Sequence, residues 1–216
     1  MSHQQSPEVL FLLATGCHHC PMVLESLTQQ LKQGNIARLD AVNIVNSPGV
    51  AQQLGVRSVP WTRIGRFELD GAMSPKEVAQ WVERAANDRG VGDYFSESLA
   101  AQRSDKVIRW LEESPEALKT LLELQENEAT PMAARIGIGV VMEQLEGDPR
   151  LSHALPTLIR QSRSEQANIR ADVAHYLGLT QLPDARSVLT EMLNDSHPDV
   201  REIAQESLAL LNNANG

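Results

Sequence analysis

Aromatic side chains and long apolar runs are scarce in this chain. Phe, Trp and Tyr make up only 4% of its 216 residues, so aliphatic side chains must fill most of any core. No stretch approaches the ~20 apolar residues that a membrane helix needs. The early apolar run at residues 9–14 is too short for a secretory signal and follows no basic segment. We therefore expect a cytoplasmic protein with no membrane partner.

Basic residues are fewer than acidic ones, but only in the second half of the chain. Residues 1–90 hold eight basic and eight acidic side chains, whereas residues 91–216 hold eleven basic and twenty acidic ones. An acidic surface repels phosphate backbones and anionic lipids, which argues against a nucleic-acid partner. A solvated acidic face and a docking surface for a basic partner would both account for the excess.

Cysteine occurs only twice, in the sequence Cys17-His18-His19-Cys20. In a reducing compartment such a pair is redox-active or metal-binding more often than structural. Four consecutive residues at the start of a helix cannot all converge on one tetrahedral ion, and no second Cys/His cluster completes a site. We expect no metal and no cofactor, with a Cu(I) or zinc site as the alternative.

The first ninety residues alternate between strand and helix patterns. Pro21 suits the first turn of a helix that Gly34 ends, and Ser74 and Glu77 form the capping box of a later helix. Strands are expected at residues 9–14, 36–44, 61–64 and 67–69, with a short helix at 48–54 between the second and third. This order predicts an α/β fold in which a parallel βαβ unit precedes an antiparallel hairpin and a closing helix.

A polar, glycine-bearing stretch at residues 87–93 is the expected boundary, which predicts domains at 1–88 and 94–216. Beyond it the sequence predicts helices and no strand. Residues 154–180 and 185–211 superimpose at an offset of 31, with Ile169-Arg170 on Val200-Arg201. Such a period marks a helical solenoid.

An earlier and weaker copy covers residues 115–145, with Met132, Ile136 and Val140 at the corresponding apolar spacing. The segments that begin at Asn168 and Asp199 resemble the second helix of a HEAT repeat. The resemblance covers about residues 115–212 and implies an all-α, HEAT-like domain that binds another protein.

The Cys17–Cys20 spacing suits thiol–disulfide exchange. A helix start stabilises a thiolate through its unpaired N–H groups and its dipole, so Cys17 can attack a partner disulfide and Cys20 can resolve the mixed disulfide. Histidine changes charge near neutral pH, and an imidazolium at His18 or His19 would stabilise the reduced pair. We therefore expect a more oxidising pair than one that encloses Gly-Pro, unless both histidines are simply exposed.

A second motif, Ser58-Val59-Pro60, precedes an expected strand and is a candidate cis-proline turn. Together with Cys17 and Cys20, it resembles the thioredoxin/glutaredoxin superfamily over about residues 7–88. The cysteine motif is most similar to the N-terminal domain of the flavoprotein component of alkyl hydroperoxide reductase. The resemblance implies that Pro60 faces Cys17 and that the Val59 backbone pairs with an extended substrate segment.

Two features depart from typical thioredoxins: no Trp precedes Cys17, and the strand at 9–13 carries no acid. Trp61 is expected either to line the substrate groove or to pack inside the sheet. We expect Trp81 and Trp110 to be core residues.

The sequence thus predicts a protein disulfide oxidoreductase whose catalytic residues are Cys17 and Cys20. Its expected partners are a protein substrate with a disulfide or thiol and an upstream thiol or flavoprotein reductase, and its helical domain is expected to recruit the substrate. The alternative is an adaptor or scaffold that is redox-inactive or only senses redox state.

Overall fold

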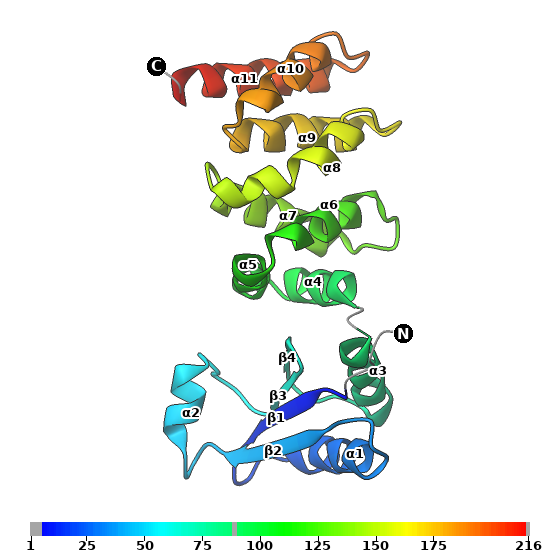
Figure 1. Cartoon of the computed structure of the whole chain (residues 1–216), viewed down its shortest axis with the longest axis vertical. Coiled ribbons are helices and arrows are strands. Elements are labelled where there is room, and N and C mark those ends of the chain that lie inside the picture. Colours follow the sequence, from blue (N-terminus) through cyan, green and yellow to red (C-terminus); the bar gives the residue numbers. More distant parts are fainter. Residues whose placement is uncertain (1–5, 88–89, 215–216) are drawn as a thin grey trace. The chain divides into compact units, whose positions relative to one another are not determined.

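The computed structural model describes residues 6–87 and 90–214 and divides the chain into two compact units, 1–90 and 91–216 (Figure 1). Helix α4 (Val91–Ala100) begins within the stretch 87–93 that the sequence assigns to a linker. Asn87 is the C-cap of the preceding helix, and residues 88–89 of that stretch lie outside the described residues. The linker is therefore shorter than its polar composition suggests.

The first unit has the predicted order of strands and helices. Its elements are β1 (Glu8–Leu13), α1 (Cys20–Lys32), β2 (Arg38–Asn43), α2 (Pro48–Gln53), β3 (Trp61–Ile64), β4 (Phe67–Asp70) and α3 (Pro75–Ala86). The strands form one sheet in the order β2-β1-β3-β4. Strand β1 pairs in parallel with β2 and antiparallel with β3, and β3 pairs antiparallel with β4.

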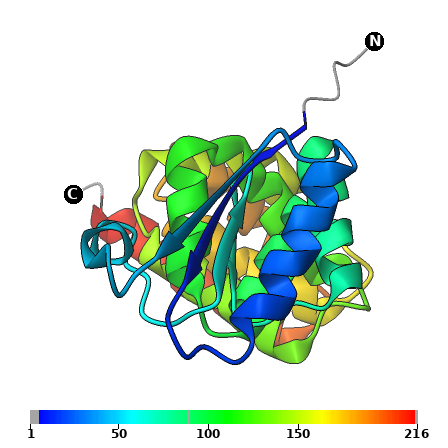
Figure 2. The ribbon, with the colours of Figure 1, turned by 90° about the horizontal axis from the view of Figure 1, so that it is seen from below.

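The sheet is covered on both faces, with α2 on one side and α1 and α3 on the other (Figure 2). On the α2 side, Leu12, Ala51 and Trp61 form a buried cluster. On the other side, the rings of Phe67 and Trp81 lie 5.1 Å apart between centroids. Burial on both faces explains why β1 is a continuous apolar run and not an alternating one.

The predicted helix ends are confirmed. Gly34 follows the C-cap of α1 with φ +77°, a left-handed conformation that costs glycine little. The Ser74 hydroxyl accepts from the Glu77 N–H at 3.3 Å, and the Ser74 N–H donates to Glu77 Oε2 at 2.7 Å. This hydrogen bonding holds the pKa of Glu77 below its usual value.

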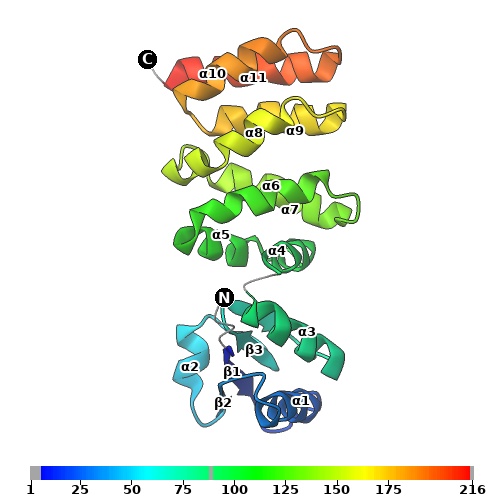
Figure 3. The same ribbon diagram turned by 45° about the vertical axis from the view of Figure 1, so that its right-hand side comes forward.

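The second unit is a stack of helices, as predicted (Figure 3). After α4 come α5 (Ser104–Glu113), α6 (Leu118–Glu126), α7 (Met132–Gln144), α8 (Leu155–Gln161), α9 (Ala167–Leu179), α10 (Pro183–Met192) and α11 (Pro198–Ala214), with 3₁₀ turns at Pro115–Ala117 and Pro149–His153. The offset of 31 places α8 on α10 and α9 on α11. None of the described helices is both long enough and apolar enough to cross a membrane.

One arginine recurs in the second helix of three successive pairs. Arg135, Arg170 and Arg201 each donate to a carbonyl of the loop before their own helix. Arg170 also binds both carboxylate oxygens of Asp195, at 2.7 and 2.8 Å, from the loop of the next pair. This ion pair links neighbouring repeats. Its side chains are only 13% and 10% exposed, so solvent screens the pair little.

The three apolar residues that mark α7 as a repeat in the sequence lie on its exposed side. Met132, Ile136 and Val140 are 69%, 64% and 39% exposed. The buried face of α7 is formed instead by Ala134, Ile138, Val141 and Met142. Both sets of residues have helical periodicity, and only the position of the neighbouring helices distinguishes them.

Candidate functional site

The cysteine pair lies where β1 passes into α1. After Leu13 the chain turns through Thr15 and Gly16, and the Cys17 N–H donates to the Ala14 carbonyl at 3.2 Å. Gly16 has φ +82°, which favours glycine at this position. Helix α1 then begins at Cys20, with Pro21 in its first turn where no N–H partner is required.

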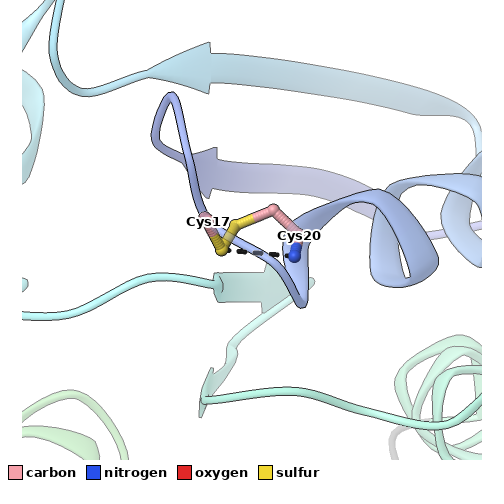
Figure 4. Close-up of a disulfide and its surroundings, with 2 residues drawn as sticks. All are labelled: Cys17 and Cys20. Atoms are coloured by element: carbon pink, nitrogen blue, oxygen red, sulfur yellow. Dashed lines mark hydrogen bonds between the residues drawn. A yellow bond between two sulfur atoms is a disulfide. The ribbon is translucent and has the colours of Figure 1, made fainter.

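Cys17 and Cys20 form a disulfide with their Cα atoms 5.5 Å apart (Figure 4). Cys20 is only 4% exposed, whereas Cys17 is partly exposed. The Cys20 N–H donates to Cys17 Sγ at 3.2 Å. In the reduced state this donor and the helix dipole stabilise negative charge on the more accessible sulfur.

The two histidines lie at the surface beside this disulfide. His18 and His19 are both exposed, and His19 is the N-cap of α1 without a side-chain capping bond. Neither imidazole has a hydrogen-bond partner among the described residues. Both side chains are therefore accessible to solvent.

The peptide bond Val59-Pro60 is cis, as the sequence predicts. Because Leu12 pairs with Trp61, Pro60 lies beside Leu13, at the end of the sheet from which the Cys17 turn departs. The Pro60 carbonyl accepts from the Gly71 N–H at 2.9 Å. The Val59 amide and carbonyl have no hydrogen bond to another described residue.

Trp61 packs inside the sheet and does not line a groove. Its side chain is 1% exposed and lies in the cluster with Leu12 and Ala51. The prediction of Trp61 as a substrate-binding residue is corrected, because the first residue of β3 points toward α2. Trp81 and Trp110 are buried, as predicted.

Two protein families match the chain. Residues 8–83 match the family model of a thioredoxin domain, and residues 115–209 match that of HEAT repeats. The chain joins a thioredoxin-like domain to HEAT-like repeats. No curated protein matches it. The likeness to the flavoprotein component of alkyl hydroperoxide reductase therefore stays a prediction.

One exposed apolar side chain in the first turn of α1 was not predicted from the sequence. Met22 is 44% exposed and lies two residues after Cys20. Val23 and Leu27 of the same helix are fully buried. The exposure of Met22 could have been predicted, because helical periodicity places it off the side of α1 that carries Val23 and Leu27.

A buried hydroxyl was also missed. Thr62 of β3 is fully buried, and its Oγ1 has no hydrogen-bond partner among the described residues. Strand β1 carries no acid after Glu8, which is exposed at the start of the strand.

Within the described part of the chain, no group of three or more His, Cys, Asp or Glu side chains is placed to hold a metal ion.

Proposed function

We propose that this protein is a thiol–disulfide oxidoreductase that acts on the cysteines of another protein. The supporting observation is the asymmetry of the sulfur pair at the start of α1. The partly exposed Cys17 Sγ accepts the Cys20 N–H at 3.2 Å, and Cys20 is buried behind it. An attacking sulfur must be accessible, whereas a resolving sulfur has to reach only its neighbour.

In the reducing direction, the Cys17 thiolate attacks one sulfur of a substrate disulfide. A mixed disulfide forms, the substrate S–S bond breaks, and the departing substrate thiolate takes up a proton. Cys20 then loses its proton and attacks Cys17 Sγ, which releases the second substrate thiol. Two electrons and two protons pass to the substrate, and the Cys17–Cys20 disulfide remains. Oxidation of a substrate follows the same steps in reverse.

The loop before β3 supplies a place for the substrate chain. The free amide and carbonyl of Val59 can pair with an extended segment around the substrate cysteine, in the manner of an added strand. His18 and His19 are proposed to favour the reduced pair when protonated.

The HEAT-like repeats are proposed to recruit the protein substrate. Tethering a redox domain to a binding domain raises the effective concentration of the sulfur pair at its target. Selectivity can then come from the repeats while the chemistry stays with Cys17 and Cys20. A separate thiol or flavoprotein reductase would return the pair to the dithiol form.

The test is mechanism-based trapping on an oxidised model protein such as insulin. A Cys20→Ser variant should accumulate a mixed disulfide with the substrate, because the resolving sulfur is absent. The matched Cys17→Ser variant should trap little, since its remaining sulfur is buried. Mass spectrometry of non-reduced digests identifies the sulfur that is bonded.

Equal trapping by the two variants would refute the assigned roles. If neither variant forms a mixed disulfide and the wild-type pair never exchanges with glutathione, the chain is an adaptor and not an enzyme. Circular dichroism of all three proteins checks that the serine substitutions leave the fold intact.

A further inference from the structure

The exposed face of α7 differs from the matching faces of the helices stacked beyond it. Buried positions align α7, α9 and α11, because Ile138, Val173 and Ala204 are each fully buried in their own helix. The residues that align with Met132, Ile136 and Val140 are then Ala167, Ala171 and His175 in α9, and Pro198, Glu202 and Glu206 in α11. The repeat architecture therefore does not require large apolar side chains at these positions.

Met132, Ile136 and Val140 form one continuous apolar line, which we call the α7 stripe. Their spacing of four residues puts them on one side of the helix, over a length of about 12 Å at 1.5 Å per residue. Their exposed fractions are 69%, 64% and 39%. Single exposed apolar residues are ordinary, whereas three in a line on one helix face are a candidate contact surface.

The surface around and beyond the α7 stripe carries negative charge. Glu143 lies on the same side of α7, and its Oε1 is 3.7 Å from His175 Nε2 of α9. Asp172, Glu202 and Glu206 are exposed on α9 and α11. Gln125 of α6 donates to Asp172 Oδ2 at 2.8 Å.

Basic side chains are few on the three helices. Helices α7, α9 and α11 contain no lysine. Their arginines, Arg135, Arg170 and Arg201, are each held by loop carbonyls. The surface is therefore apolar on α7 and acidic toward α11.

We infer that this surface binds a cationic amphipathic helix of the protein substrate, with its apolar side chains on the α7 stripe and its lysines or arginines toward Glu202 and Glu206. The inference rests on the proposed function, since it names the kind of substrate that the repeats recruit. Charge decides between occupants. A second copy of this chain would bring another net charge of −9 to an acidic surface, whereas a basic helix is complementary.

The binding test uses the full chain with Cys17→Ser and Cys20→Ser, so that sulfur chemistry cannot contribute. The probe is a fluorescein-labelled peptide of leucine and lysine, about 14 residues long, with leucines on one helical face. Fluorescence anisotropy should show saturable binding. The matched peptide with glutamate in place of every lysine should not bind. Equal binding of the two peptides would overturn the inference.

Two variants test the two parts of the surface. Met132→Ala with Ile136→Ala copies the alanines found at the aligned positions of α9, so the fold should tolerate it, and the affinity should fall at least ~10-fold. Glu202→Gln with Glu206→Gln should weaken binding about 5-fold at low salt, with the difference vanishing at high salt. The control Leu193→Ala changes a residue that is 36% exposed after α10 and should bind like its parent.

Unchanged affinity in the α7 double variant would overturn the inference. So would a dimer, seen by light scattering, that the same variant dissociates, because the α7 stripe would then join two copies. The proposed function is tested separately, by giving the wild-type chain the peptide with a disulfide-linked glutathione. Binding without release of glutathione leaves the docking surface intact and refutes the enzymatic role.

Discussion

The candidate site of the first unit and that of the second unit are formed in different ways. In the thioredoxin-like domain, the pairing of β1 with β3 brings the Cys17 turn and the Pro60 loop to the same end of one sheet, although they are more than forty residues apart. In the HEAT-like repeats, one helix pair recurs, and a surface arises where aligned positions carry different side chains. A reactive site of a few residues requires that segments distant in the sequence come together in the fold. An extended binding surface requires only that the side chains at equivalent positions differ from one repeat to the next.

The largest expected effect is the loss of exchange in Cys17→Ser. Activity toward both a small disulfide and a protein disulfide should fall at least ~1,000-fold, because the only accessible sulfur nucleophile is removed. The α7 double variant should instead slow only the protein substrate. The turnover of a fluorescent small disulfide and of a protein disulfide is measured for each variant with glutathione as the reductant. This comparison tests whether the first unit carries the chemistry and the second unit binds the substrate. A Cys17→Ser enzyme that still turns over protein disulfides would contradict it.

The next effect concerns the tie between repeats. Asp195→Asn should destabilise the second unit by about 2 kcal/mol, since the partly buried Arg170 guanidinium loses its charged partner. Chemical denaturation measured separately for the two units should show the loss in the HEAT-like unit alone. The exposed pair of Arg38 and Asp40, with side chains 60% and 46% exposed, offers a control, because Asp40→Asn should change stability little.

The same ion pair predicts a direction with pH. Hydrogen bonds from Arg170 hold the pKa of Asp195 below its usual value. A depressed folded-state pKa gives stability that is fully present above the unfolded-state pKa and is lost as the pH falls through the folded-state pKa. Wild type should therefore lose more stability than Asp195→Asn between about pH 5 and pH 2. Parallel acid titrations of the two proteins would contradict the assignment.

A smaller effect is expected at the histidines. His18→Ala with His19→Ala should lower the reduction potential of the Cys17–Cys20 pair by about 30 mV, equivalent to about 1.4 kcal/mol, because an imidazolium that stabilises the thiolate can no longer form. Equilibration with glutathione buffers at neutral pH measures the shift. His153→Ala, at an exposed position in the second unit, should leave the potential unchanged. A wild-type potential well below about −270 mV, the thioredoxin value, would contradict the histidine effect outright.

The smallest effect is expected at Thr62. Thr62→Val should leave stability unchanged or raise it by up to ~1 kcal/mol, since the buried hydroxyl has no partner among the described residues and Val keeps its shape. Thermal unfolding of the first unit measures the change. A loss above ~1 kcal/mol would mean that the hydroxyl is hydrogen-bonded in the folded protein.

Much of the fold could be predicted because its signals are local. Gly34 and the Ser74–Glu77 capping box mark helix ends through backbone geometry that neighbouring residues alone determine. The period of 31 residues is visible because each helix pair buries apolar side chains at equivalent positions. Trp61 and the α7 stripe could not be placed, since which face of an element is buried depends on partners distant in the sequence.

The sequence by itself determined the sulfur pair, the proline loop, the order of the elements and the acidic excess of the second half, because each is a property of residue type and spacing. Only the tertiary structure decided that Trp61 is internal and that the α7 stripe faces outward. Exposure is decided by what packs against a residue, and those contacts form only when the sheet and the helix stack assemble.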